Sequence, residues 1–185
     1  SKVLSISSPK EVGPVMRCAL QLEGPVYVRF GKAWEEEIYK DEPKFEYGIG
    51  QELVSGQDIA IISTGSIVSS VLKAEKILRE KQYSARCINI STIKPLDELC
   101  IVKAAKETGR ILVVEEHGTI GGLASAVAEV IAKNDINVQF ESMGFENRFC
   151  MDYGWYQDIK KINGLDEEAI GRKALEMLSK QGKKA

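Results

Sequence analysis

The sequence has few of the residues on which metal centres and disulfide scaffolds depend. It contains four cysteines, Cys18, Cys87, Cys100 and Cys150, and a single histidine, His117. The cysteines lie far apart and form no CxxC pair, which argues against a zinc site and against a disulfide framework. Cys87 falls in an apolar run with strand character and Cys100 in a helical one. We expect both to be reduced, small buried residues of a cytosolic protein.

Long apolar runs and an excess of either charge are also lacking. No stretch approaches the roughly 18–20 consecutive apolar residues of a membrane span, and the first residues do not have the pattern of a signal peptide. The 25 Lys and Arg nearly balance the 27 Asp and Glu, and the formal net charge is −2. We therefore expect no membrane partner and no nucleic-acid partner.

The composition is that of a globular protein that can bury a core. Of the 185 residues, 44% are hydrophobic and 28% are charged, as in typical soluble domains. The sequence begins abruptly with the strand-like run SKVLSIS, so we expect it to be a piece of a longer chain. No internal repeat and no low-complexity segment is present.

The first 31 residues predict one strand–helix–strand unit. Residues 3–7 have strand character, and Ser8 and Pro9 are typical of a helix start because serine caps free amides and proline suits the first turn. Residues 26–30 form the second apolar run. Two strands bury little surface alone, so residues 1–31 are predicted to be the end of a larger domain.

The next segment predicts a linker, and the remainder predicts an open parallel sheet. Residues 32–46 are charged and without periodicity, and aromatic residues such as Trp34 and Tyr39 could anchor them. Strands and helices then alternate, which predicts right-handed crossovers and a three-layer α/β/α sandwich. The predicted strands are 47–54 at an edge, 58–63, 85–90, 111–114 and 138–141, and the predicted helices are 68–78, 96–105, 123–131 and 166–178.

Parallel sheets bind ligands beyond the carboxyl ends of their strands, so the turns after the predicted strands are candidate sites. One such turn is Ser63-Thr64-Gly65-Ser66. Gly65 permits a tight bend, and the Ser66 side chain can cap the next helix. The turn could cradle an anion, but it lacks the second glycine and the lysine of a P-loop, so helix capping is the favoured interpretation.

A second turn carries the histidine. It reads EEHGTIGG, with Glu115, Glu116 and His117 followed by the pair Gly121 and Gly122. A histidine beside carboxylates suits proton transfer, and a glycine pair at a helix start lets a ligand approach the helix amides. Neighbouring carboxylates on a strand point in opposite directions, however, and paired glycines also serve close helix–sheet packing. We favour the packing role and keep proton transfer as the alternative.

Two further segments predict local structure, and the second of them also has a functional interpretation. Residues 92–97 (TIKPLD) predict the start of a helix, with Asp97 favourable in the first turn. Residues 143–156 mix aromatic residues with Arg148. This composition predicts a packed loop, and a subunit contact is the alternative.

The end of the early strand is the remaining candidate site. Arg29-Phe30-Gly31-Lys32 places two cations around a glycine where a strand runs into a loop. That arrangement can hold a phosphate group. Two solvated surface charges would give the same pattern.

Taken in order, these segments resemble the C-terminal region of the transketolase superfamily. The most specific are GPVYVRFGK at residues 24–32, STGS at 63–66 and EEHGTIGG at 115–122. ISTIKPLDE and the closing GLDEEAI add to the likeness, which spans nearly the whole chain. Split transketolases and deoxyxylulose-phosphate synthases are the most similar groups, and 2-oxoacid dehydrogenase E1 β-subunits are more distant.

The resemblance implies a domain organisation. Residues 1–31 would be the last βαβ unit of a pyrimidine-binding domain, residues 32–46 a linker and residues 47–185 the C-terminal domain. That domain would have a five-stranded, mostly parallel sheet with strand 47–54 as its antiparallel edge. In the superfamily, thiamine diphosphate and Mg²⁺ are bound by earlier parts of the enzyme, so the resemblance implies no catalytic, cofactor-binding or metal-binding residue in this chain alone.

The resemblance also implies one substrate contact. The arginine with which the family binds the substrate phosphate falls, without gaps, at Lys32. A lysine neutralises phosphate as a point charge but lacks the two-pronged hydrogen bonding of arginine. Arg29 is the alternative contact.

The function implied is transfer of a two-carbon ketol unit between sugar phosphates, carried out together with an N-terminal thiamine-binding part and in a homodimer. The isolated chain is expected to be inactive. Three alternatives remain: a 2-oxoacid dehydrogenase β-type region, a deoxyxylulose-phosphate synthase-type region, and a non-enzymatic module that docks or binds a small anion.

Overall fold

The computed structural model describes residues 1–32, 35–145 and 153–179. Its strands are β1 (Lys2–Ser5), β2 (Val26–Arg29), β3 (Gln51–Val54), β4 (Ile59–Thr64), β5 (Ala85–Asn89), β6 (Thr92–Lys94), β7 (Arg110–Gly118) and β8 (Gln139–Phe145). Its helices are α1 (Val12–Ala19), α2 (Val68–Glu80), α3 (Glu98–Thr108), α4 (Leu123–Lys133), α5 (Tyr156–Ile162) and α6 (Glu167–Ser179), and short 3₁₀ helices, η1 (Pro9–Glu11) and η2 (Gly65–Ile67), precede α1 and α2.

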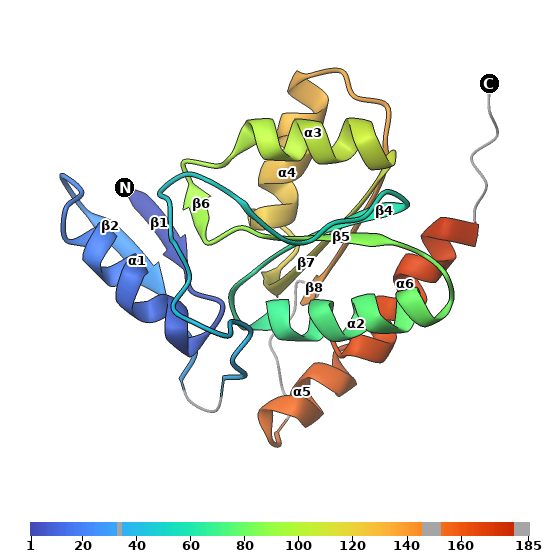
Figure 1. The fold of residues 1–185 in the computed structure, drawn as a ribbon, viewed down its shortest axis with the longest axis horizontal. Coiled ribbons are helices and arrows are strands. Elements are labelled where there is room, and N and C mark those ends of the chain that lie inside the picture. The colour runs from blue at the N-terminus through green and yellow to red at the C-terminus, as the bar shows by residue number, and fades with distance from the viewer. Residues whose placement is uncertain (33–34, 146–152, 180–185) are drawn as a thin grey trace.

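The main sheet has the predicted architecture. Its five strands lie in the order β3-β5-β4-β7-β8, all parallel except β3, which pairs antiparallel with β5 at the edge. Helices α3 and α4 cover one face and α2 and α6 the other (Figure 1). The predicted three-layer α/β/α sandwich with one antiparallel edge strand is therefore confirmed.

Alternation along the central strands divides the core into two layers. In β4, Ile59 and Ile61 face α2 and α6, whereas Ala60 and Ile62 face α3 and α4. All four are fully buried. Because both faces of a parallel strand are covered, the strand reads as a continuous apolar run instead of an alternating one. This is why the run at residues 58–63 predicts a central strand.

The N-terminal unit forms a separate small sheet beside the main one (Figure 1). Strands β1 and β2 are parallel and joined by α1, as expected. The order β2-β1-β6 shows that a third strand from the C-terminal part completes this sheet, with β6 antiparallel to β1. The small core of Leu4, Ile6 and Val15 lies between the strands and α1.

Strand β6 and helix α5 are the two elements that the sequence did not indicate. Residues 92–97 were expected only to start a helix, but Thr92–Lys94 pair with β1 before Asp97 caps α3 by accepting from the Cys100 amide at 2.9 Å. Residues 143–156 were expected to be a packed loop. At the two ends of this segment β8 instead continues to Phe145 and α5 begins at Tyr156, while residues 146–152 lie outside the described ranges.

A buried polar network joins the N-terminal unit to the C-terminal domain. The Glu11 carboxylate, 2% exposed, accepts from the Ser7 amide at 2.7 Å and the Ser7 hydroxyl at 2.6 Å, and also from Ser91 of the main domain. Asn89 donates to Ser7 at 2.9 Å and to the Tyr39 hydroxyl at 3.0 Å. Burial, followed by the nearby Glu11 charge, raises the pKa of Tyr39 to about 12, so its hydroxyl stays protonated. The network fixes the linker as well as the two units.

No helix in the described ranges is long and apolar enough to cross a membrane. Cys87 is buried in β5, as predicted, and burial raises the pKa of its thiol to about 12. Cys100 on α3 was also expected to be buried, but it is only half-buried. Trp34, Arg148 and Cys150 lie outside the described residues.

Candidate functional site

A cavity of about 620 Å³ lies where the N-terminal unit meets the carboxyl ends of β4, β7 and β8. Parallel strands expose their final backbone groups and the following turns at this edge, so the location is that of ligand sites in related sheets. The volume is in the range of small-molecule pockets. The lining residues are Ser5, Ile6, Arg29, Phe30, Gly31, Lys32, Glu35, Gly65, Ser66, Glu116, Phe145, Gly154, Trp155 and Tyr156.

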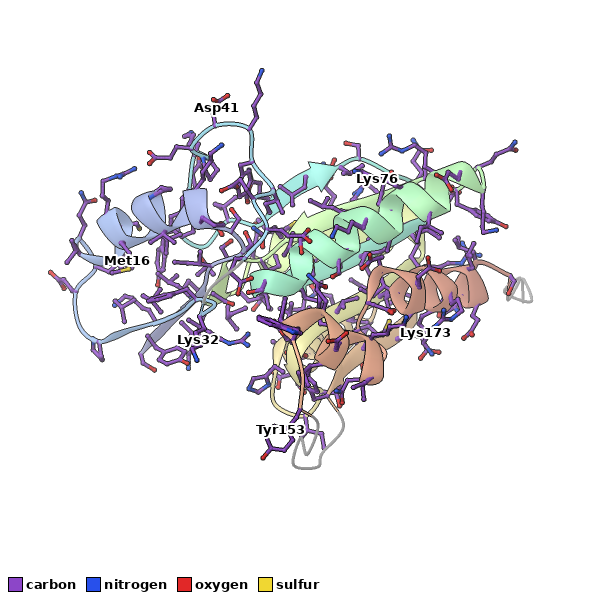
Figure 2. All side chains as sticks on the ribbon, turned by 90° about the horizontal axis from the view of Figure 1, so that it is seen from below. Met16, Lys32, Asp41, Lys76, Tyr153 and Lys173 are labelled. Atoms are coloured by element: carbon purple, nitrogen blue, oxygen red, sulfur yellow. The ribbon has the colours of Figure 1, made fainter. Side chains whose placement is uncertain are left out.

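The two predicted phosphate-binding residues both line this cavity. Lys32 is exposed and lies at the boundary between the N-terminal unit and the C-terminal domain (Figure 2). Arg29 is half-buried, and its Nη2 donates to the Glu116 carbonyl oxygen at 3.0 Å. Arg29 therefore uses part of its hydrogen-bonding capacity inside the protein, whereas Lys32 is an exposed residue of the cavity lining.

The neighbouring carboxylates of β7 point in opposite directions, as the strand geometry requires. Glu115 is 2% exposed and accepts from the amides of Leu123 and Ala124 at 2.8 and 2.9 Å, so it caps α4. Glu116 faces the cavity and accepts from the Tyr156 hydroxyl at 3.1 Å. Burial raises the pKa of Glu116, while the Tyr156 hydrogen bond and the Arg29 charge oppose the change.

Helix α5 supplies the opposite wall of the cavity. The pKa of Tyr156 is raised well above its usual range, chiefly by burial and then by the negative charges of Glu116 and Glu35. Behind it, the Lys160 ammonium lies 4.6 Å from the centre of the Tyr156 ring and donates to the Ser70 hydroxyl at 2.8 Å. Burial lowers the pKa of Lys160. The ring of Tyr156 is thus held between Lys160 and Glu116.

The turn after β4 lies on the cavity floor and does not cap α2 as expected. Ser66 lies inside η2, where no side chain caps the helix, and its hydroxyl adjoins that of Tyr156. Gly65 has φ +70°, and a Cβ there would lie 3.0 Å from Ser5 Oγ and 3.6 Å from Arg29 Nη1. Ser5 is 4% exposed, and its hydroxyl has no hydrogen-bond partner among the described residues. The positive φ and the short distance to Ser5 together explain why position 65 is a glycine where the N-terminal unit approaches the turn.

His117 lies outside this cavity. With Gly121 and Gly122 it lines a smaller hollow of about 230 Å³ that also contacts β1. A Cβ on Gly122 would lie 2.1 Å from Glu115 Oε2, so this glycine makes room for the helix cap. Gly122 thus has the packing role that we favoured for the pair, with Glu115 as its close neighbour. A Cβ on Gly121 would meet nothing within 4 Å, so Gly121 does not share this role, and its φ of +77° instead favours a glycine in the turn.

Tyr156, Ser5 and Lys160 were missed by sequence reasoning. Tyr156 fell at the end of the segment 143–156, whose composition gave no helix start, and Ser5 falls within an early strand. Ser5 and Tyr156 line the cavity and Lys160 packs against Tyr156, although the three residues come from segments far apart in sequence. Arg29, Lys32, Ser66 and Glu116 line the cavity too, and their positions at or after the ends of predicted strands did give a signal.

No group of three or more His, Cys, Asp and Glu residues in the described ranges is placed to hold a metal ion. The described residues do not fit a Mg²⁺ site. The cavity lining instead combines two cations with carboxylate and hydroxyl groups, a set suited to binding an organic phosphate.

Comparison of the sequence with known protein families identifies the family of the C-terminal domain. Residues 48–170 match the family model described as the transketolase C-terminal domain. The chain belongs to the transketolase C-terminal domain family. The family match begins near the predicted start of the C-terminal domain, while the boundaries assigned to the pyrimidine-domain remnant and the linker stay predictions.

Curated relatives of this transketolase-family chain include separate C-terminal sections and subunits. A protein of Methanocaldococcus jannaschii named putative transketolase C-terminal section is 40% identical over 90% of this chain and 52% of its own length. A protein of Phocaeicola vulgatus, named as one of the subunits of apulose-4-phosphate transketolase, is 40% identical over 84% of this chain and 49% of its own length. The chain spans about half the length of these relatives.

Solved structures show the same fold. A structure described as a split gene transketolase, inactive beta4 tetramer, has a TM-score of 0.90 and 29% identity, covering 96% of this chain and 58% of its own. A transketolase mutant from Pichia stipitis has a TM-score of 0.66 at 21% identity, covering 98% of this chain and 26% of its own, and supports the fold alone.

Proposed function

We propose that this chain is the C-terminal part of a transketolase-type enzyme that depends on thiamine diphosphate and Mg²⁺ and transfers a two-carbon ketol unit between sugar phosphates. The names of the relatives from Methanocaldococcus jannaschii and Phocaeicola vulgatus support the proposal. The observation that carries it is the shared cavity, because Lys32 and Arg29 of the N-terminal unit open onto it together with groups of the C-terminal domain.

In this proposal Lys32 holds the phosphate group of the substrate. Its ammonium is exposed at the cavity rim and is free to form charge-assisted hydrogen bonds with phosphate oxygens. Arg29 is a secondary contact, since one arm of its guanidinium is already bound to the Glu116 carbonyl. The phosphate would thereby fix one end of the substrate at the boundary between the two units.

The proposed partner is an N-terminal thiamine-binding part of the same enzyme. The exposed side of α1 carries Val12, Met16 and Leu20 at spacings of four residues, and Leu20 is 84% exposed. Strand β2 is an edge strand of its small sheet. An apolar stripe beside an open strand edge supports continuation of this unit into a larger domain, as predicted for residues 1–31.

The chemistry is divided between the two parts. Thiamine diphosphate, when bound by the complete enzyme, supplies the electron sink for breaking and forming the carbon–carbon bond. The residues of this chain bind and orient the phosphorylated end of the substrate and provide surface for assembly. A homodimeric enzyme in the cytosol is part of the proposal, and the isolated chain is expected to be inactive.

A ketol-transfer assay on the chain recombined with the N-terminal part tests this function. We expect transfer by the recombined enzyme and none by the chain alone. Lys32→Ala is expected to raise the KM for phosphorylated substrates by about 10- to 100-fold, the loss of one or two charge-assisted hydrogen bonds, and Lys32→Arg should retain binding. Lys76→Ala is the matched control, because Lys76 is an exposed lysine on α2, away from Lys32 (Figure 2). Recombined protein that binds thiamine diphosphate but never transfers ketol units would contradict the proposal.

A deoxyxylulose-phosphate synthase-type activity is the second candidate. The enzyme of that name from Oleidesulfovibrio alaskensis is 34% identical over 96% of this chain, which corresponds to 29% of its own length. The same recombined protein separates the two, since a synthase would consume a 2-oxoacid and release carbon dioxide, whereas a transketolase would use a ketose phosphate as donor. The docking-module interpretation predicts neither reaction.

A further inference from the structure

We propose that Glu116 and Tyr156 of the C-terminal domain bind hydroxyl groups of the sugar phosphate and make the cavity selective for a polyhydroxylated chain. The inference rests on the proposed function and deepens it, because it assigns a specificity-determining role to the C-terminal domain. It starts from the composition of the cavity wall.

The charges of the wall fit neither a simple anion nor a simple cation. Arg29 and Lys32 are offset by Glu35 and Glu116, all four lining the same cavity. A site for inorganic phosphate alone would gain nothing from two carboxylates, which repel it. A ligand that carries a phosphate at one end and hydroxyl groups along its chain uses both kinds of group, since hydroxyls donate to carboxylates and phosphate oxygens accept from cations.

Glu116 and Tyr156 are held in position to meet such hydroxyls. Tyr156 donates to Glu116 Oε2 at 3.1 Å, and within the described part of the chain no side chain donates to the other oxygen, Oε1. The Ser66 hydroxyl adjoins that of Tyr156. The Lys160 ammonium lies over the Tyr156 ring, 4.6 Å from its centre, and restrains the orientation of the ring. Free acceptor capacity and a rigid support are what a selective polar contact needs.

A second observation points to a ligand at the same place. Ser5 is 4% exposed and lines the cavity, yet its hydroxyl has no hydrogen-bond partner among the described residues. Buried hydroxyl groups are nearly always paired, so the Ser5 hydroxyl, buried just behind the cavity surface, is an exception that a polar ligand reaching this part of the wall would relieve. Two aromatic side chains at the rim, Phe30 and Trp155, are 60% and 79% exposed and offer apolar surface to the C–H groups of a sugar.

The arrangement divides recognition between the two units. Lys32 at the rim contacts the phosphate, and the pair formed by Glu116 and Tyr156 contacts the hydroxylated chain. Removing a hydroxyl from the ligand would leave a half-buried polar group of the site unpaired, and sites built to hydrogen-bond a ligand hydroxyl discriminate against the ligand that lacks it. Discrimination between a polyol phosphate and an alkyl phosphate is therefore the property to measure.

The test compares two phosphates of equal chain length, a five-carbon ketose 5-phosphate and n-pentyl phosphate, by calorimetric titration of the 185-residue chain. We expect the wild-type chain to prefer the ketose phosphate. Tyr156→Phe, which keeps the ring over Lys160, and Glu116→Gln should each reduce that preference about five- to tenfold, the effect of losing one hydrogen bond. Lys32→Ala should weaken binding of both phosphates alike.

Tyr153→Phe is the matched control. Tyr153 is 94% exposed, does not line the cavity and projects away from the body of the molecule (Figure 2). The control should leave both affinities unchanged. Far-ultraviolet circular dichroism and urea unfolding of each variant verify that the fold is retained.

Two results with the wild-type chain would overturn the inference: equal affinity for the two phosphates, or no binding of either at millimolar concentrations. Two results with the variants would also overturn it. If Tyr156→Phe and Glu116→Gln both leave the preference unchanged, or if they weaken binding of both phosphates equally, Glu116 and Tyr156 have a merely structural role. Ketol transfer by the recombined wild-type enzyme is measured separately. If transfer occurs while the preference is absent, only the inference fails; if transfer is absent, the proposed function fails.

Discussion

At the scale of the residue, two adjacent glutamates at the end of β7 have different structural roles. Glu115 and Glu116 are identical in type, but the alternation of the strand turns the first into the protein and the second into the cavity. The first carboxylate satisfies two free amides of α4, and such capping also suits the positive end of the helix dipole. The residue type could not distinguish the two roles, but the alternation of side-chain direction along a strand predicts that the two carboxylates point to opposite sides.

Gly122 is the residue-scale test of this cap. In Gly122→Ala the new Cβ would lie 2.1 Å from Glu115 Oε2, so the carboxylate must move and the cap weakens. We expect a loss of about 1–3 kcal/mol in the free energy of unfolding, the usual cost of overpacking, measured by urea denaturation. Gly118→Ala is the control, since a Cβ there meets nothing within 4 Å. An equal effect of both substitutions would contradict the capping role.

At the scale of the element, the N-terminal unit is tied to the C-terminal domain by groups from several segments. Strand β6 adds the third strand beside β1, and the Glu11 carboxylate draws donors from Ser7 and Ser91. A buried carboxylate is stable only when hydrogen bonds replace its lost hydration. The position of Arg29 and Lys32 over the cavity therefore depends on these contacts between the N-terminal unit and the C-terminal domain.

Glu11→Ala tests this dependence. The substitution leaves buried donors of Ser7 and Ser91 without their acceptor, and we expect a loss of about 3 kcal/mol or more in the free energy of unfolding. Hydrogen exchange should increase in β1 and β2 more than in β4 and β7. The exposed pair of Arg17 and Glu42 provides the control, because Glu42→Ala at the surface should cost less than about 1 kcal/mol. An equal increase of hydrogen exchange throughout the Glu11→Ala chain would contradict a local role of Glu11 in joining the N-terminal unit to the C-terminal domain.

At the scale of the whole molecule, the chain has a well-packed domain at one end and an incompletely covered unit at the other. The main sheet has helices on both faces, whereas the α1 side of the N-terminal unit exposes Val12, Met16 and Leu20. The chain also spans about half the length of its curated relatives. Both facts support assembly with a further part at the N-terminal unit.

Leu20→Lys tests that assembly surface. Leu20 is 84% exposed, so the stability of the isolated chain should change by less than about 0.5 kcal/mol. Association with the N-terminal part, measured by calorimetry, should weaken at least tenfold because a charge would be buried in the contact. Leu99→Lys on α3 is the matched control, at 82% exposure, and should associate normally. Equal association of both variants would exclude α1 from the interface.

The sequence by itself determined the layered α/β architecture and the family. Apolar runs such as residues 58–63 predict central strands because local periodicity follows from which faces are covered, and motifs such as GPVYVRFGK and EEHGTIGG carry the resemblance. Tertiary structure alone decided that Thr92–Lys94 pair with β1 and that Tyr156 meets Glu116. These contacts join residues distant along the chain, and no local pattern encodes them, because their stability comes from packing between units.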